Sequence, residues 1–331
     1  MPLLSFTDFE AYADALAGVD GLMRVTGPVG RAWTLDILDA GDATAMLGQD
    51  GAPALYNGLS QSGRYVVHIS LPGSDAFMQG SATADDQFVW FAPGVEVHGF
   101  TRTQSKFIAL DMDTTAVVQR AREVAELFDD HIDRTYAVNV GRAEMAPIIT
   151  LVTRALAIHR QTPSVFDAPS VRRSFSGQVI HALLRCMVLA NPEAVRRTRG
   201  RPTLPRNEII RLSLDHIHKS ILGEAVIGDL VLSAGTSQRS LSRAFDEVFG
   251  MGPHQYFMLE RLHVIRKALR EASPGDTVTS VCARYGVWDQ GRFAGMYHRT
   301  FGLHPSMELA AALDSWRANM AGRSTRWGAS S

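Results

Sequence analysis

Residues 227–305 contain two copies of one unit, and this internal repeat constrains the fold more than any other feature of the chain. Leu230 and Gly235 of the first copy match Val281 and Gly286 of the second, 51 positions later. Five further matches lie 52 positions apart: Leu241 with Phe293, Phe245 with Tyr297, Phe249 with Phe301, Gly250 with Gly302, and Pro253 with Pro305. The spacing changes by one residue in the turn, where an insertion is tolerated. Two copies of one supersecondary unit therefore occupy this part of the chain.

Each copy has the sequence of a helix-turn-helix. A short apolar helix ends at Gly235 or Gly286, because glycine readily adopts the left-handed conformation that a tight turn needs. Ser237 and Asp289 then supply side chains of the type that caps the next helix. A long helix predicted from Pro253 to about residue 271 joins the copies, so we expect about seven helices in roughly 100 residues. An all-α bundle without a role in DNA binding is the alternative.

The charges are divided unevenly along the chain. Residues 1–195 carry 14 Lys and Arg against 22 Asp and Glu, whereas residues 196–331 carry 19 against 12. The net charge of −1 thus hides an acidic N-terminal part and a basic C-terminal part that suits a polyanionic partner. Residues 191–206 hold three prolines and five arginines. This composition predicts an exposed basic linker, which either is simply solvated or also touches phosphates.

Residues 208–306 resemble the C-terminal DNA-binding domain of the AraC/XylS family of bacterial transcription regulators. The matching positions are Leu230, Gly235, Ser237 to Leu241, Phe245, Phe249, Gly250, Pro253, Tyr256, Arg261, Leu262, Gly286, Phe293, Tyr297, Phe301, Gly302, Pro305 and Ser306. The resemblance implies two motifs that enter successive major-groove faces of one double-stranded DNA, since one turn of the duplex is about 34 Å. It also implies an activator that works with RNA polymerase and forms a homodimer.

The second helix of the first motif is the better equipped to read bases. At about 100° per residue, several polar side chains lie opposite the apolar face formed by Leu241 and Phe245. Arginine there can contact O6 and N7 of guanine together, although a phosphate contact or a solvated charge is the alternative. The predicted DNA-binding residues of this motif are Ser237, Gln238, Arg239, Ser242, Arg243 and Asp246.

The equivalent helix of the second motif carries few long side chains. Its predicted DNA-binding residues are Gln290, Gly291, Arg292, Gly295, His298 and Arg299. Because Gly291, Ala294 and Gly295 lie on its outward face, we expect this helix to position the protein on DNA and to discriminate bases weakly.

The N-terminal part is predicted to be rich in β-structure. Short apolar or alternating runs predict strands at residues 31–38, 64–71, 87–91, 95–100 and 106–112, separated in several places by Gly/Pro turns. Many short strands of this kind indicate a sandwich or a small barrel. A capping box at residues 7–10 predicts a helix to about residue 17. Further helices are predicted at about residues 115–128, 143–160 and 169–190.

These strands also resemble, less specifically, the cupin-like sensor domain found in part of the same family. The resemblance implies a small organic effector in the mouth of the barrel and dimerisation through the helices that follow. The candidate effector-binding residues are Trp33, Tyr65, His68, Trp90 and His98, and an ordinary place in the core is the alternative for each. We expect no metal and no cofactor, because the region lacks paired histidines; a metal held by His68 and His98 is the alternative.

The predicted fold class is therefore α+β: an N-terminal cupin-like barrel or sandwich with flanking helices, then an all-α domain of two helix-turn-helix motifs. The predicted divisions are residues 1–190 for the effector and dimerisation domain, 191–206 for the linker, 207–308 for the DNA-binding domain, and 309–331 for a C-terminal helix and tail.

Three functions are compatible with this organisation. The first is a DNA-binding regulator that responds to a small molecule. The second is a cupin-like enzyme tethered to a DNA-binding module, and the third is a regulator whose N-terminal domain only dimerises or binds a protein. We expect no enzymatic activity, because neither a nucleophile elbow nor a phosphate loop occurs.

The sequence also bears on the compartment. No apolar run approaches the ~20 residues that span a bilayer, and the first residues lack the pattern of a secretory signal. Cys186 and Cys282 are too few for a disulfide framework, so we expect two reduced core thiols. The predicted location is the bacterial cytoplasm.

Overall fold

The computed structural model describes residues 3–16, 18–124, 132–190, 206–220 and 227–327. The described residues group into two compact units. One lies within Met1–Met23 and Val29–Arg201, and the other within Arg24–Pro28 and Pro202–Ser331. The predicted basic linker lies outside the described residues except for Arg206, and so does the end of the predicted tail.

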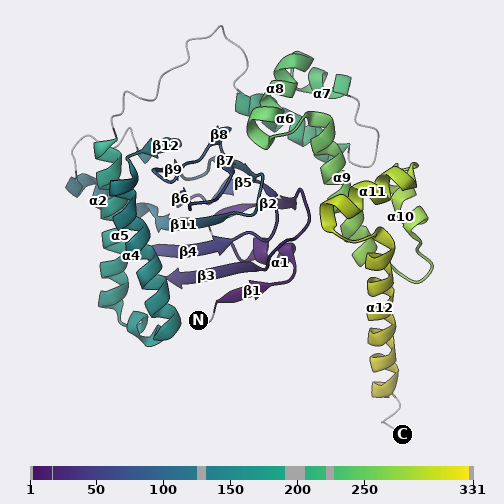
Figure 1. Ribbon diagram of the computed structural model, residues 1–331, viewed down its shortest axis with the longest axis horizontal. Helices are drawn as coiled ribbons and strands as arrows, with labels where there is room; N and C mark the ends of the chain where they lie inside the picture. Colours follow the sequence, from purple (N-terminus) through teal and green to yellow (C-terminus); the bar gives the residue numbers. More distant parts are fainter. Residues whose placement is uncertain (1–2, 17, 125–131, 191–205, 221–226, 328–331) are drawn as a thin grey trace. The chain divides into compact units, whose positions relative to one another are not determined.

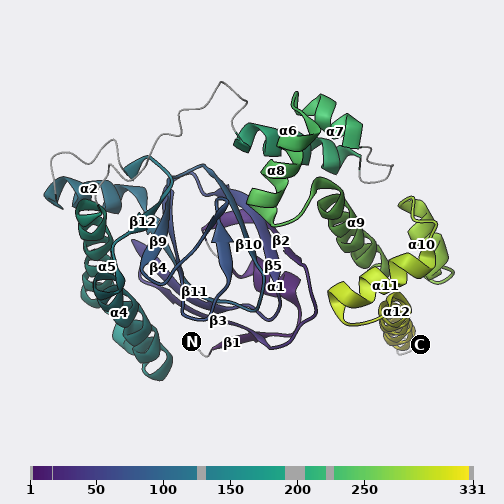
Figure 2. The same ribbon diagram turned by 45° about the horizontal axis from the view of Figure 1, so that its top comes forward.

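The first unit is built around two β-sheets (Figures 1 and 2). The seven-stranded sheet has the order β1 (Leu4–Phe6), β3 (Trp33–Asp39), β4 (Ala43–Gln49), β11 (Lys106–Asp113), β6 (Arg64–Ser70), β9 (Gln87–Phe91) and β12 (Tyr136–Asn139). The five-stranded sheet has the order β2 (Val19–Val25), β5 (Ala54–Ser60), β10 (Glu96–Thr101), β7 (Ala76–Met78) and β8 (Ser81–Ala82). At the centre of the larger sheet, β11 pairs antiparallel with both β4 and β6.

Successive side chains of a strand point to opposite sides of the sheet. The residues of the central strands therefore show what each face of the seven-stranded sheet contacts. On β6, Tyr65, Val67 and Ile69 join the main hydrophobic core. Val66 and His68 instead line a cavity together with side chains of the five-stranded sheet. Strands β9 and β11 divide their side chains in the same way. One face of this sheet therefore belongs to a core, and the other encloses a space between the sheets.

Three helices cover the core face: α2 (Thr114–Val124), α4 (Arg142–Gln161) and α5 (Pro169–Leu189). The helices α4 and α5 lie side by side along the sheet, joined by the 3-10 turn η1 (Pro163–Asp167) (Figure 1). The apolar stripe of α5 is wholly buried at Val179, Leu183 and Leu184. The hydroxyl of Ser176 donates to the carbonyl of Ala40 at 3.2 Å, which fixes α5 against the turn before β4.

The five predicted strands are confirmed as β3, β6, β9, β10 and β11, each within two residues of its predicted ends. The predicted helices at 143–160 and 169–190 are confirmed as α4 and α5, and the described part of the helix at 115–128 is α2. The predicted capping box is wrong in detail. Helix α1 (Phe9–Asp14) is capped by Asp8, whose carboxylate accepts from the Glu10 N–H at 2.8 Å, and the helix ends before residue 17.

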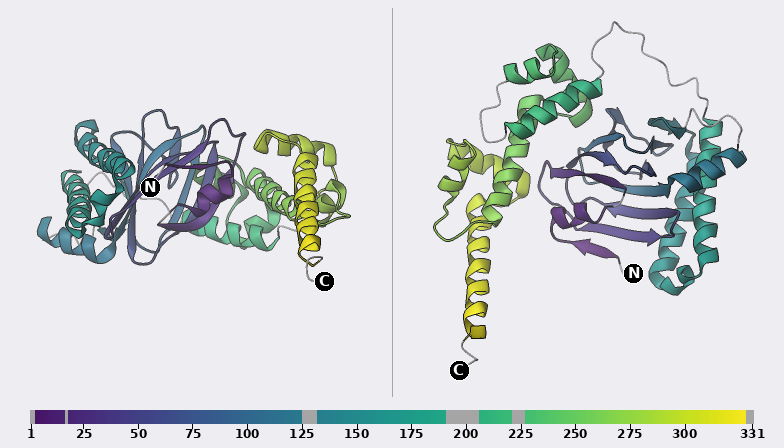
Figure 3. Two further views of the ribbon diagram at one scale, coloured as in Figure 1. Left: turned by 90° about the horizontal axis from the view of Figure 1, so that it is seen from below. Right: turned by 180° about the vertical axis from the view of Figure 1, so that it is seen from behind.

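The second unit contains seven helices in the described part of the chain (Figure 3). They are α6 (Arg206–Lys219), α7 (Ile227–Ser233), α8 (Gln238–Phe249), α9 (Pro253–Arg270), α10 (Val278–Arg284), α11 (Gln290–Phe301) and α12 (Pro305–Trp327). The turns before α8 and α11 contain Gly235 at φ +57° and Gly286 at φ +68°, the left-handed conformation that the repeat predicts. The predicted fold class is confirmed: a two-sheet unit with flanking helices, and an all-α unit with two helix-turn-helix motifs.

Among the residues that the structure describes, no helix combines the length and the apolar character that crossing a bilayer requires.

Candidate functional site

Helix α8 is held by one apolar face and presents the other to solvent. Ser237 caps it by accepting from the Ser240 N–H at 3.2 Å. Leu241, Ala244, Phe245, Val248 and Phe249 are buried on its inner face. The rings of Phe245 and Phe249 pack against Tyr256 of α9, with centroids 5.6 and 4.6 Å away. This contact fixes the direction in which the outer face of α8 points.

The predicted DNA-binding residues of the first motif lie on that outer face. Ser237, Gln238, Arg239, Arg243 and Asp246 are exposed, and Ser242 is partly exposed. The two arginines differ in their surroundings. Arg243 donates from Nε to Glu247 Oε1 at 2.7 Å, whereas Arg239 has no ion-pair partner in the described part of the chain.

The ion pair at Arg243 changes the electrostatics of this face. The hydrogen bond from Arg243 lowers the pKa of Glu247, so the carboxylate stays charged and partly neutralises the guanidinium. Arg206 of α6 lies 3.6 Å from the other oxygen of the same carboxylate. Arg239 is therefore the uncompensated cation of the α8 surface.

Helix α11 is capped and buried in the same way as α8, but its exposed face carries fewer long side chains. Asp289 caps it by accepting from the Arg292 N–H at 3.0 Å, and Phe293, Tyr297 and Phe301 are buried. Of the predicted DNA-binding residues, those exposed are Gly291, Arg292, His298 and Arg299, while Gln290 and Gly295 are partly exposed. Gln290 is also engaged, because its Oε1 accepts from the Thr279 hydroxyl at 2.9 Å. Few free polar groups are left on this helix.

The glycines of α11 are not required by packing. A Cβ added at Gly291 would lie 3.8 Å from its nearest neighbour, and one at Gly295 would lie 3.6 Å from Arg299 Nη1. Both are ordinary contacts, so larger side chains could be accommodated at these two positions, and packing does not explain why glycine is present there. Trp288, in the turn before α11, is 79% exposed and was not predicted as part of this surface. Its position directly before the residue that caps α11 is the sequence feature from which it could have been predicted as part of this surface.

A buried cluster of polar side chains ties the second motif to the connecting helix. Glu308, in the first turn of α12, accepts from the Tyr297 hydroxyl at 2.6 Å and from Arg266 Nε at 3.2 Å. The side chains of Arg266 and Glu308 are 11% and 9% exposed. Helices α9, α11 and α12 are therefore joined by one charged centre.

The first unit contains a cavity of about 100 Å³ between its two sheets. Most of its wall is apolar, with Val66 and Phe91 from the larger sheet and Val97 and Phe100 from β10. Of the five predicted effector-binding residues, His68 alone lines it. Tyr65 and Trp90 lie on the opposite, helix-facing side of the sheet, where their rings pack 5.0 Å apart.

Trp33 and His98 do not line the cavity either. Trp33 is buried against Tyr12, with ring centroids 5.1 Å apart. His98 is buried on β10, with Nε2 3.4 Å from Glu96 Oε2. Within the described residues no group of three His, Cys, Asp or Glu side chains is placed to hold a metal ion.

The polar end of the cavity is formed by Asp50, which the sequence prediction missed. Its side chain is 1% exposed. One carboxylate oxygen accepts from the Tyr12 hydroxyl at 3.1 Å, and the other accepts from the Ser105 hydroxyl at 2.5 Å. Burial raises the pKa of Asp50 to about 6, although the hydroxyl hydrogen bonds oppose the shift. The same burial lowers the pKa of His68 to about 4, so His68 is neutral near pH 7.

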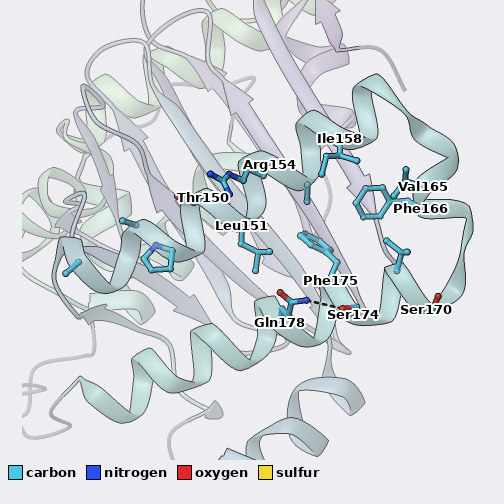
Figure 4. Close-up of a pocket in the computed structure, with 15 residues that line it drawn as sticks. Thr150, Leu151, Arg154, Ile158, Val165, Phe166, Ser170, Ser174, Phe175 and Gln178 are labelled. Atoms are coloured by element: carbon cyan, nitrogen blue, oxygen red, sulfur yellow. Dashed lines mark hydrogen bonds between the residues drawn. The ribbon is translucent and has the colours of Figure 1, made fainter.

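A second, open groove runs between α4 and α5 (Figure 4). Its apolar wall includes Leu151, Ile158, Val165 and Phe175. Ile158 is 46% exposed and Val165 is 38% exposed, values that are high for side chains of this type. At one edge, Gln178 Nε2 donates to Ser174 Oγ at 3.0 Å.

Comparison with known proteins finds a family profile that matches the repeat region, curated relatives and solved structures. Residues 230–310 match the sequence profile of a family described as helix-turn-helix domain. The chain is 34% identical over 110 residues to a probable thc operon regulatory protein of Rhodococcus erythropolis, which covers 33% of this chain and 32% of that protein. It is 30% identical over 149 residues to XylDLEGF operon transcriptional activator 3 of Pseudomonas putida, which covers 45% of this chain and 43% of that protein.

The chain thus matches less than half the length of either curated relative. Among solved structures, a probable AraC family transcriptional regulator from Rhodopseudomonas palustris is 27% identical with a TM-score of 0.31. That match covers 32% of this chain and 97% of the other.

Proposed function

We propose that the protein is a sequence-specific DNA-binding transcription regulator of the AraC/XylS type that responds to a small organic effector, because residues 230–310 match a helix-turn-helix domain and the similar curated proteins are named as operon regulators. The observation that carries the proposal is the pair of similarly capped helices, α8 and α11, each buried on one face and exposed on the other.

In this proposal the two helices enter successive major-groove faces of one duplex. Helix α9 connects the motifs and has 18 residues, a length of about 27 Å at 1.5 Å per residue. One turn of DNA is about 34 Å, so a rigid connection of this size suits two readers on one side of the duplex. Tyr256 of α9 packs on α8, and Arg266 of α9 meets Glu308 at the second motif, which supports a rigid connection.

The first unit supplies the regulatory part of the proposal. The cavity between its sheets would hold the effector, and the groove between α4 and α5 would seat a second copy of the chain in a homodimer. The relative from Pseudomonas putida is named a transcriptional activator. Activation through contact with RNA polymerase in the bacterial cytoplasm is accordingly the direction of regulation that we propose. We propose no enzymatic activity, no metal and no cofactor for this chain.

The test begins by selecting DNA sites for the full-length protein from a random library. Arg239→Ala should then weaken binding to the selected site by about 1–3 kcal/mol and relax the preference at one base pair, because the uncompensated guanidinium loses a contact with guanine. Arg243→Ala should do the same less strongly, since Glu247 already holds that side chain. Arg142→Ala, an exposed change in the first unit, is the matched control and should alter neither quantity.

Equal losses for selected and random DNA in the Arg239 variant would show that this residue holds a phosphate and does not read a base. Failure of the library to yield any enriched site would contradict the proposed function itself. If the protein were instead a cupin-like enzyme on a DNA-binding module, it would turn over a substrate. If its N-terminal domain only dimerised, no small molecule would change DNA occupancy.

A further inference from the structure

The cavity between the two sheets limits the size of what it can hold. Its volume of about 100 Å³ is somewhat below the ~150 Å³ at which an engineered protein cavity accepts benzene. Val66, Phe91, Val97, Phe100 and Phe107 give it a mainly apolar wall. A fitting ligand is therefore small, with an apolar body of roughly the size of a short alkyl chain, and a single ring lies at the upper limit of the size.

The single acidic group of the cavity wall is Asp50, and its hydrogen bonds come only from uncharged groups. Tyr12 and Ser105 donate hydroxyl protons to it, and no cation pairs with it in the described part of the chain. A carboxylate offers about four acceptor positions, so these two bonds and the interaction with the Tyr56 hydroxyl still leave room for a ligand donor. Arg102, three positions before Ser105, is exposed and lies over the ring of Phe77 instead.

The other titratable groups around the cavity do not compensate the charge. His68, on β6, is neutral near pH 7 because burial lowers its pKa to about 4. Tyr12 of α1 and Tyr56 of β5 are neutral because burial and the neighbouring Asp50 raise the pKa of both hydroxyls well above the ordinary value. Burial raises the pKa of Asp50 to about 6, so most of the population carries a negative charge at pH 7.5.

Tyr56 adds a second polar feature at the same end. Its hydroxyl is buried and makes no hydrogen bond of good geometry with the described residues. The hydroxyl interacts with the Asp50 carboxylate, so it adds a second polar group beside that residue. The cavity therefore has a mainly apolar wall, and at one end it has a carboxylate that no cation compensates and the neighbouring hydroxyl of Tyr56.

From this arrangement we infer that the effector is a small apolar amine, whose ammonium group binds Asp50 while its body fills the space between the sheets. The inference rests on the proposed effector-responsive function and names the chemical class of the effector. A carboxylic acid of the same size would place a second negative charge beside Asp50 in a medium of low dielectric constant, which is unfavourable.

The test measures binding to the full-length protein by isothermal titration, using matched sets of probes at pH 7.5. One set is butylamine, butan-1-ol and butyrate, and the other is benzylamine, benzyl alcohol and benzoate. We expect at least one amine to bind at least tenfold more tightly than the alcohol and the carboxylate of its set. Amine binding should weaken as the pH falls through about 6, where Asp50 gains a proton.

Asp50→Asn should lower the affinity for the amine at least tenfold, so that the amine no longer binds more tightly than the alcohol of its set. Tyr56→Phe keeps the shape of the cavity and should reduce amine binding severalfold. Asp36→Asn is the matched control, because Asp36 is also a buried carboxylate but does not line the cavity, and it should leave amine binding unchanged. Circular dichroism of each variant confirms that it is folded.

Tighter binding of benzoate or butyrate than of the matching amine would overturn the inference. So would amine binding that is unaffected in both the Asp50 and the Tyr56 variants, or the absence of binding by every amine. DNA binding is measured separately on the selected site. An amine that binds at Asp50 without changing DNA occupancy would support the ligand class and contradict the proposed regulatory role.

Discussion

At the scale of single residues, the cavity brings together two titratable side chains whose effects on stability have opposite signs. The pKa of Asp50 is raised by folding from 3.8 to about 6, so its contribution to stability is full below about pH 4 and is lost as the pH rises through 6. The pKa of His68 is lowered from 6.5 to about 4, so its contribution is full above about pH 6.5 and is lost as the pH falls. The two nearly cancel across the same window.

Two variants should separate these contributions. Relative to the unmodified protein, the free energy of unfolding of His68→Gln should fall by about 3 kcal/mol as the pH rises from 4 to 6.5, because the contribution that His68 gains over this range is removed. Relative to the unmodified protein, the free energy of unfolding of Asp50→Asn should rise by about the same amount between pH 4 and 6, because the contribution that Asp50 loses over this range is removed. Calorimetric unfolding of both variants across this range is the measurement. Parallel profiles in the two variants would contradict the opposed signs.

The predicted pocket shows where residue-level prediction fails. Tyr65 and His68 both lie on β6, but they are three positions apart and therefore point to opposite faces of the sheet. The strand was predicted, so this alternation was available from the sequence. Asp50 follows the end of β4, and nothing in the local sequence indicates that Tyr12 and Ser105 converge on it. Such convergence depends on the tertiary fold.

At the scale of elements, glycine and cap residues made the second unit predictable. Gly235 and Gly286 mark the turns, and Ser237 and Asp289 cap the next helices, so α8 and α11 begin where the sequence places them. The first unit was harder. Strand β4 has four consecutive buried residues, Ala43–Met46, because it lies in the middle of a sheet with both faces covered, and it lacks the alternation that identifies a strand.

The exposed face of α11 leads to a prediction about that helix. Gly295→Ala should stabilise the protein by about 0.5–1 kcal/mol, because alanine is the better helix former and its Cβ meets only ordinary contacts. Base preferences in the half of the site under α11 should stay weak in both proteins, while those under α8 stay strong. The measurements are thermal unfolding and binding to a fully randomised site. Loss of DNA affinity in this variant would show that the helix backbone approaches the DNA closely there.

The charged centre that joins α9, α11 and α12 should matter for stability. Glu308→Ala should cost about 3 kcal/mol of unfolding free energy, because it leaves the largely buried Arg266 without this carboxylate and the Tyr297 hydroxyl without its acceptor. Asp314→Ala is the control on the same helix. Its ion pair with Arg317 is 73% and 71% exposed, so the loss should be under about 1 kcal/mol. A small effect in both variants would mean that apolar packing alone holds α12 in place.

At the scale of the whole molecule, the charge division predicts how DNA binding responds to salt. The logarithm of the affinity should fall linearly with the logarithm of the salt concentration, by about 0.9 per phosphate contacted. Arg292→Ala and Arg299→Ala should each reduce that slope by about 0.9, if α11 positions the protein through phosphates. Arg142→Ala in the acidic first unit should leave the slope unchanged. An unchanged slope in all three variants would remove α11 from the contact with the DNA backbone.

Because α8 and α11 carry different exposed side chains, the proposed complex with DNA has a defined orientation. A protein that binds as two equal halves occupies its site identically after a half turn, so the site carries no orientation. In the proposed function, one end of a single chain reads bases through Arg239, and the other end places glycines against the groove. Reversing such a site reverses the bound protein, so the DNA sequence alone decides which flank of the protein faces a promoter.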